Sequence, residues 1–136
     1  MVINMGQNFS NNNVTPPRNN LTVITSLKEA YFLWISYFVH LPNIHKYSLG
    51  ENVSKLFVEA IEMTVYASFM AKNEKLPFVK IAIRKTDTIK VFIQLIWEMK
   101  IFDDKKYIAL SEKLNETGKR LGGWHNKLVK ENSPAK

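Results

Sequence analysis

An apolar stripe near the C-terminus is the feature that most constrains the fold of this chain. Its members follow one another at steps that alternate between three and four residues, which places them on one side of an α-helix. They are Tyr107, Leu110, Leu114, Thr117, Leu121, Trp124 and Leu128. A helix with one apolar side buries that side against other elements of the fold. The stripe therefore predicts a long amphipathic helix over residues 105–130.

Three earlier segments have helical patterns of their own. The apolar and aromatic run from Thr22 to Leu41 predicts a buried helix, which Pro42 ends. Apolar residues recur at steps of three and four over residues 53–70 and again over residues 82–96, which predicts two further helices. Four amphipathic helices joined by short loops predict an all-α fold, an antiparallel up-and-down four-helix bundle.

Residues at the segment ends mark where the predicted helices begin. Ser48, followed three residues later by Glu51, is a capping-box pattern that predicts the start of the second helix. Pro77 suits the first turn of a third helix that covers about residues 78–100. An aspartate in the turn at residues 101–104 is available as the N-cap of the last helix.

Composition divides the chain into a folded body and two tails. The first twenty residues hold seven asparagines and a Pro-Pro pair, and they have too few apolar side chains to offset the entropy of ordering. We expect residues 1–20 to form a disordered tail, residues 21–131 to form the four-helix bundle, and residues 132–136 to form a short C-terminal tail. A chain of 136 residues has room for one core.

The sequence lacks the motifs of most catalytic and metal sites. It has no cysteine, which excludes disulfides and thiolate metal sites. His40, His45 and His125 form no metal-ligand spacing, and no phosphate-binding glycine loop or nucleophile motif occurs. We therefore expect no enzyme activity, no cofactor, no metal and no small-molecule substrate. No signal-peptide pattern is present, which predicts a cytoplasmic protein, and the apolar run at residues 30–41 is too short to span a bilayer.

The net charge of +7 is confined to the second half of the chain. Residues 1–74 hold five basic and five acidic residues, whereas residues 75–136 hold fourteen basic and seven acidic residues. Such an asymmetry is typical of a surface for phosphates or for an acidic partner. It is equally compatible with charge that serves only solubility.

Basic residues recur every seven positions in the last predicted helix, so they form one ridge along it. Over about 30 Å of helix, such a ridge can contact several phosphates of RNA or DNA. The ridge consists of Lys106, Lys113, Arg120 and Lys127; the remaining predicted nucleic-acid-binding residues are Lys119 and Lys130 beside it and Lys80, Arg84 and Lys85 in the third helix. The two groups form one patch if packing brings the helices together. Glu116 lies four residues before Arg120, so a simple exposed ion pair is the alternative interpretation there.

Three glycines interrupt the same helix, although a glycine inside a helix costs about 1 kcal/mol relative to alanine. Gly118 and Gly122 are four residues apart and remove side-chain bulk from one face. Either the helix ends or kinks near residue 122, or another backbone packs closely against it. The apolar stripe continues through Trp124, which favours close packing. We therefore expect Gly118, Gly122, Gly123 and Trp124 to form a packing or subunit contact.

The run ETGKRLGGWHNKL at residues 116–128 resembles the C-terminal signature of a family of small four-helix bundles. This family includes the accessory variability determinant of diversity-generating retroelements and the proteins encoded in ribosomal-RNA intervening sequences. The shared pattern is a glycine, two basic or polar residues, an aliphatic residue, a glycine, a small residue and a tryptophan. YSLGENV at residues 47–53 is a weaker match. The segment VEAIEMTVYASF lacks the small-residue motif of the intervening-sequence branch, which favours the retroelement branch.

This resemblance implies a homopentameric barrel of bundles that binds RNA or DNA together with the reverse transcriptase of a retroelement. The protein would be an accessory factor in mutagenic cDNA synthesis and not itself a catalyst. The alternative is a self-associating four-helix-bundle scaffold of the intervening-sequence type, without a specific nucleic-acid function. We expect no membrane partner, and attachment to a membrane surface through the first predicted helix is a third interpretation.

Overall fold

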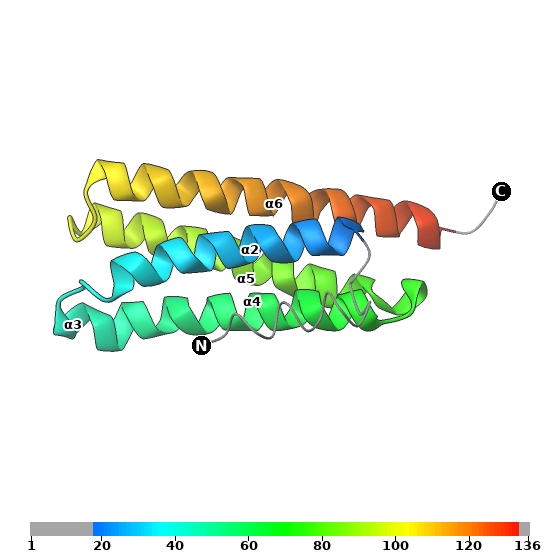
Figure 1. Ribbon diagram of the computed structural model, residues 1–136, viewed down its shortest axis with the longest axis horizontal. Coiled ribbons are helices and arrows are strands. Elements are labelled where there is room, and N and C mark those ends of the chain that lie inside the picture. Colours follow the sequence, from blue (N-terminus) through cyan, green and yellow to red (C-terminus); the bar gives the residue numbers. More distant parts are fainter. Residues whose placement is uncertain (1–17, 134–136) are drawn as a thin grey trace, which may run out of the picture.

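The computed structural model describes residues 18–133, and in this part of the chain four long helices pack against one another (Figure 1). They are α2 (Arg18–Phe38), α4 (Glu51–Phe69), α5 (Leu76–Glu98) and α6 (Asp104–Asn132), joined by the short turns α3 (Asn43–His45), η1 (Lys46–Gly50) and η2 (Lys72–Glu74). The described residues contain no β-strand. The prediction of an all-helical fold with four packed helices is confirmed. Residues 1–17 and 134–136 of the predicted tails lie outside the described part.

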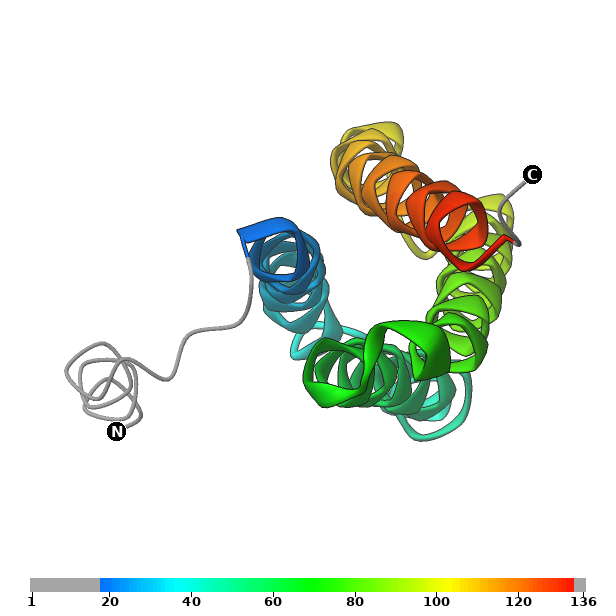
Figure 2. The same ribbon diagram turned by 90° about the vertical axis from the view of Figure 1, so that its right-hand side faces the viewer.

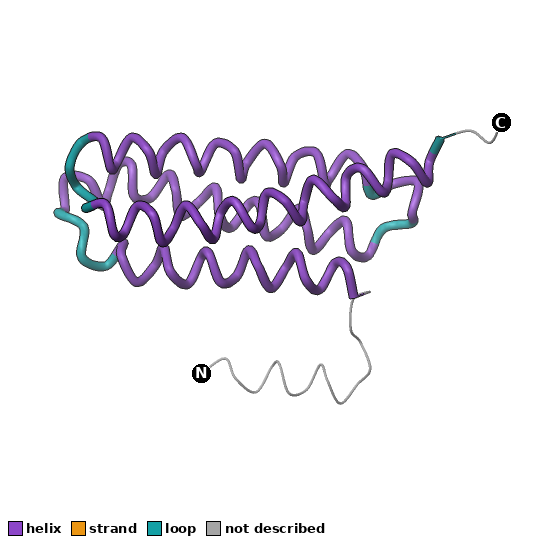
Figure 3. Tube along the Cα trace, turned by 90° about the horizontal axis from the view of Figure 1, so that it is seen from above, coloured by secondary structure: helices purple, strands orange, loops and turns teal. Residues whose placement is uncertain are grey.

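The four long helices follow one another around a ring. Helix α2 contacts α4 and α6, and helix α5 also contacts α4 and α6. The end-on view of Figure 2 shows the same order, with α2 and α5 at opposite corners. The body therefore has four seams between neighbouring helices, and Figure 3 shows the short loops at its ends.

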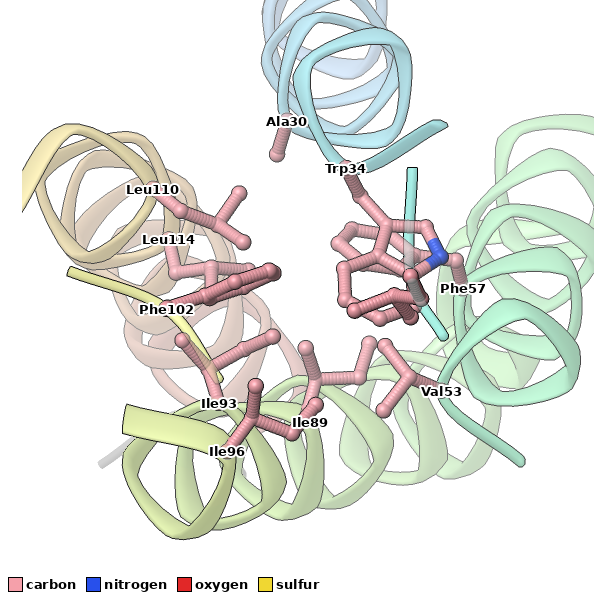
Figure 4. Packing of buried hydrophobic residues seen from close by; sticks show 11 residues of the cluster. Ala30, Trp34, Val53, Phe57, Ile89, Ile93, Ile96, Phe102, Leu110 and Leu114 are labelled. Atoms are coloured by element: carbon pink, nitrogen blue, oxygen red, sulfur yellow. The ribbon is translucent and has the colours of Figure 1, made fainter. Parts of the chain in front are cut away.

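One half of the core is built around Trp34. Its side chain is fully buried, and its indole Nε1 donates a hydrogen bond to Ser54 Oγ at 2.9 Å. Its ring stacks on Phe57 and meets the edge of Phe102. Figure 4 shows side chains of all four long helices converging here, with the isoleucines of α5 below the Trp34 ring.

The other half of the core is mainly aliphatic, with Trp124 as its one buried aromatic residue. It is formed by Val23, Leu27, Ala60, Ala67, Val79, Ala82, Leu121, Trp124 and Leu128. Between the two halves, α5 places the buried Thr86 and α6 places the buried Thr117. The Oγ1 atom of Thr117 lies 2.8 Å from Oγ of the buried Ser26, which joins α6 to α2 by a hydrogen bond. No buried side-chain nitrogen or oxygen of the described residues lacks a hydrogen-bond partner.

The start of the second long helix differs from the prediction. Ser48 does not form a capping box, because the chain is already helical from Asn43 and Ser48 lies inside the π-type turn η1. Its hydroxyl instead donates to the carbonyl oxygen of Ile44, one turn earlier, at 2.8 Å. The residue before Glu51 is Gly50. Its backbone is helical, and it has no side chain that could cap the helix. The capping-box prediction was therefore wrong.

The other two predicted helix starts agree with the structure. Pro77 lies in the first turn of α5, where its missing N–H group costs no helical hydrogen bond. Asp103 is the N-cap of α6, and its Oδ1 accepts a hydrogen bond from the backbone N–H of Lys106 at 2.9 Å. Helix α2 begins at Arg18, four residues before the predicted start at Thr22.

Lys100 closes the C-terminal end of α5 with a left-handed backbone, at φ 65°. The N–H of Ile101 bonds to the carbonyl of Ile96 at 3.1 Å, and the N–H of Lys100 bonds to the carbonyl of Trp97 at 2.9 Å. This pair of bonds is a Schellman motif, whose left-handed position is most often glycine. A lysine at this position destabilises the fold slightly, because its Cβ atom lies close to the following carbonyl oxygen in the left-handed conformation.

We predict that Lys100→Gly raises the free energy of unfolding by about 0.5–1 kcal/mol, because the glycine adopts this conformation without strain. Urea denaturation followed by circular dichroism measures the change. Lys119→Gly is the matched control, since Lys119 is exposed in the middle of α6, and there the same substitution lowers stability by about 1 kcal/mol. Equal destabilisation by both substitutions would contradict the assignment of the cap.

Candidate nucleic-acid interface

The predicted basic ridge of α6 lies along the seam between α6 and α2. The Nζ atom of Lys106 lies 5.5 Å from the centre of the Tyr37 ring on α2. The Nζ atom of Lys113 lies 3.6 Å from a carboxylate oxygen of Glu29, also on α2. The ridge therefore faces a neighbouring helix over its first half.

The aromatic ring beneath Lys106 belongs to a tyrosine that resists ionisation. Burial, and then the nearby carboxylate of Asp103, raise the pKa of Tyr37 above its ordinary value. The ring keeps its neutral hydroxyl and offers its face to the ammonium group, a cation–π contact. Lys106 is thus held on α2 by packing as well as by charge.

Arg120 is engaged within its own helix. Its Nη2 and Nε atoms donate to one oxygen of Glu116 at 2.9 and 3.3 Å, so the ion pair expected from the spacing is present. Both side chains are about half exposed, and a pair of this kind contributes little to stability. Two of its guanidinium nitrogens are bound to Glu116, and Nη1 has no partner among the described residues.

The remaining cations of α6 have no such partners. Lys119, Lys127 and Lys130 are exposed and make no ion pair with any described residue. The two carboxylates in this part of the helix are used elsewhere, because Glu116 pairs with Arg120 and Glu131 lies 3.9 Å from Lys72. Positive charge without compensation therefore gathers on the C-terminal half of α6.

The start of α5 lies at the same end of the body. Asn132, the last residue of α6, donates to the carbonyl of Lys72 in the turn before α5 at 3.4 Å. Lys80 and Arg84 are exposed on this first part of α5, one turn apart, and neither makes an ion pair with a described residue. The free cations of α5 and α6 thus share one end of the molecule.

Lys85 does not join them. Its Nζ atom lies 3.1 Å from an oxygen of Glu59 on α4, so it belongs to the α4–α5 seam. That seam and the α2–α6 seam lie on opposite sides of the ring of helices. The structure therefore does not bring all nine predicted cations into one patch.

The glycines of α6 neither end nor interrupt the helix, which continues to Asn132. A Cβ atom at Gly118 would lie 2.8 Å from Nζ of Lys90, whose side chain from α5 covers this glycine. A Cβ atom at Gly122 or Gly123 would meet no atom of the described part of the chain within 4 Å. The interpretation that the helix ends near residue 122 is wrong, and no second backbone among residues 18–133 packs against Gly122 or Gly123.

A small pocket lies where the start of α2 meets the C-terminal half of α6. It has a volume of about 290 Å³ and is lined by Thr22, Val23, Arg120, Gly123, Trp124 and Lys127. The two cations, the glycine and the tryptophan were all predicted site residues. Thr22 and Val23 were not, because nothing in the sequence indicates which residues of α2 oppose residues a hundred positions later.

Residues 18–133 contain neither a metal cluster nor a membrane span. No three histidine or acidic side chains in this range lie close enough together to hold a metal ion. None of the helices there combines the length and the apolar character that crossing a bilayer requires. Comparison with protein-family models, with curated proteins and with solved structures gives no match to the chain.

Proposed function

We propose that this protein is a basic adaptor that binds the phosphate backbone of RNA or DNA. The observation that carries the proposal is the group of exposed cations on the C-terminal half of α6, whose neighbouring carboxylates are engaged elsewhere. Phosphate contacts by lysine supply affinity without reading sequence. Because lysines outnumber arginines sixteen to three, we expect binding that tolerates many sequences.

The resemblance of residues 116–128 extends this proposal to a biological setting. In it the protein is an accessory factor of a diversity-generating retroelement, located in the cytoplasm, that holds template RNA or cDNA together with the reverse transcriptase. It assembles as a homopentamer. Catalysis belongs to the partner.

The same proposal includes an antiparallel up-and-down order of the four helices. Two sets of contacts support it. The turn η2 between α4 and α5 touches the end of α6 through Lys72. Near the opposite end, Trp97 of α5 stacks on Tyr107 at the start of α6, with ring centres 4.5 Å apart. The directions of the helices in Figure 1 agree with this order.

Fluorescence-anisotropy titration of a labelled structured RNA and a duplex DNA at several salt concentrations tests the proposal. Three free lysines on α6 lead us to expect a log–log slope of affinity against salt of about −2 to −3. Little preference among sequences of equal length is expected as well. Weak binding that does not change with salt would mean that the charge serves solubility alone.

A self-associating scaffold is the second candidate, favoured by exposed apolar side chains on the neighbouring helices α2 and α4. Phe32 on α2 is 66% exposed and Phe69 on α4 is 67% exposed, and Val58 on α4 is also exposed. Exposed apolar side chains gathered on neighbouring elements commonly mark contact surfaces between proteins. Light scattering after size-exclusion chromatography tests whether the protein assembles. The anisotropy titration separates the candidates, since a scaffold assembles but does not bind the labelled RNA.

A further inference from the structure

The pocket between α2 and α6 combines features that a flat basic surface lacks. Its apolar lining comes from Val23 and from Trp124, which is 7% exposed. Gly123 removes side-chain bulk from its edge, so a ligand can approach the backbone of α6 there. The pocket is thus a defined concave site between α2 and α6.

Its charged groups match a small anion. Arg120 and Lys127 both line the pocket, seven residues apart on one face of α6. Arg120 has donor capacity that Glu116 does not use, because Nη1 makes no bond to it. Lys127 makes no ion pair with a described residue.

The charge balance distinguishes between kinds of phosphate. Glu116 neutralises one of the two cations, which leaves a single positive charge at the pocket. A phosphodiester carries one negative charge, whereas a phosphate monoester or inorganic phosphate carries nearly two at neutral pH. The pocket therefore suits an internal phosphate of a strand better than a free or terminal phosphate.

We infer that this pocket seats one phosphodiester of the bound nucleic-acid strand, with Arg120 and Lys127 as its two cationic contacts. The inference rests on the proposed function and adds one defined contact, at which a single phosphate is held in place. Lys119 and Lys130 attract the strand without fixing its position. The seated phosphate sets where the strand lies along α6.

Two glycine variants separate the pocket from general electrostatic attraction. Gly123→Leu adds bulk at the pocket without changing charge, whereas Gly122→Leu adds the same side chain at a neighbouring position that does not line the pocket. Neither new Cβ atom meets a neighbour within 4 Å, so both variants are expected to fold. Circular dichroism and light scattering verify that helicity and assembly are equal in the two proteins.

We expect Gly123→Leu to raise the Kd for a short labelled RNA about tenfold or more, the loss that follows when charge-assisted hydrogen bonds to one phosphate are removed. Gly122→Leu leaves the Kd within about twofold of the unaltered protein. Lys127→Gln and Lys130→Gln form a second matched pair. Both substitutions reduce the salt slope by about one. In the Lys127→Gln background, however, adding Gly123→Leu no longer raises the Kd, whereas in the Lys130→Gln background it still does.

Nuclear magnetic resonance on the unaltered protein provides a readout that needs no variant. Titration with dimethyl phosphate, a small phosphodiester, is expected to shift the backbone amide signal of Gly123 and the indole signal of Trp124. Inorganic phosphate at equal concentration shifts them less. Signals of Trp34 and Trp97 stay in place, because neither residue lines the pocket.

The outcomes distinguish the pocket from the wider proposal. Equal RNA affinity in Gly123→Leu and Gly122→Leu, with binding still lost at high salt, overturns the pocket and leaves the nucleic-acid adaptor intact. Absence of RNA binding in the unaltered protein overturns the adaptor and with it the seated strand. Binding to phosphatidylglycerol vesicles that Gly123→Leu abolishes, with RNA binding unchanged, assigns the pocket to a lipid headgroup and overturns the inference.

Discussion

Replacing Lys119, Lys127 and Lys130 together with glutamate is expected to lower the affinity for RNA or duplex DNA about 100-fold or more at low salt. These three exposed lysines have no carboxylate partner among the described residues, so nothing in the fold depends on their charge. Reversing them turns attraction to phosphate into repulsion on one face of α6. Anisotropy titration of the same labelled nucleic acids measures the loss.

The matched control is the triple variant of Lys28, Lys55 and Lys105 to glutamate. These lysines are also exposed and free of ion pairs, but they lie on α2, on α4 and at the opposite end of α6. Both triples change the net charge by the same amount. A similar loss of affinity in the two would show that overall charge, not the C-terminal half of α6, governs binding.

Replacing Trp34 with alanine is expected to lower the free energy of unfolding by about 3–5 kcal/mol, the usual cost of removing a buried tryptophan. The side chain is fully buried among rings of α2, α4 and the turn before α6, and its loss leaves a cavity at the centre of the larger core cluster. The hydroxyl of Ser54 also loses its donor. Urea denaturation followed by circular dichroism gives the change.

Phe32→Ala is the comparison for this stability loss. Phe32 belongs to the same helix but is 66% exposed, so its removal is expected to change stability by less than about 0.5 kcal/mol in the monomer. A loss at Trp34 no larger than the loss at Phe32 would contradict the packing of the core. Trp34 and Phe32 thus compare the buried and the exposed side of α2.

Helix α6 was predictable because its apolar stripe is narrow and the rest of its surface is polar. Six of the seven predicted stripe residues are buried, and Tyr107 is half-buried. Helix α4 was harder, since apolar residues occur on most of its sides. The structure buries Phe57 and Thr64. The predicted steps of three and four that start at Val53 pass instead through Leu56 and Met63, which are only half-buried. A helix with a wide apolar surface does not define its own orientation.

The candidate site was predictable only as a set of cations. Their spacing along α6 places Arg120 and Lys127 on one face, which the sequence shows directly. Their partners across the seam, Glu29 and Tyr37, depend on how α2 is aligned with α6. That alignment arises from packing of the two helices, and no local pattern encodes it.

The bond between Ser26 and Thr117 bears on this alignment. It is a buried polar contact between α2 and α6, set among leucines and valines. A displacement of α6 by one turn would place Leu114 or Leu121 opposite Ser26 and break a bond worth about 1 kcal/mol. An apolar seam alone tolerates such sliding far better, because one leucine replaces another. This pair of hydroxyl groups therefore sets the register between the two helices. The register determines which residue of α2 lies beside each cation of α6.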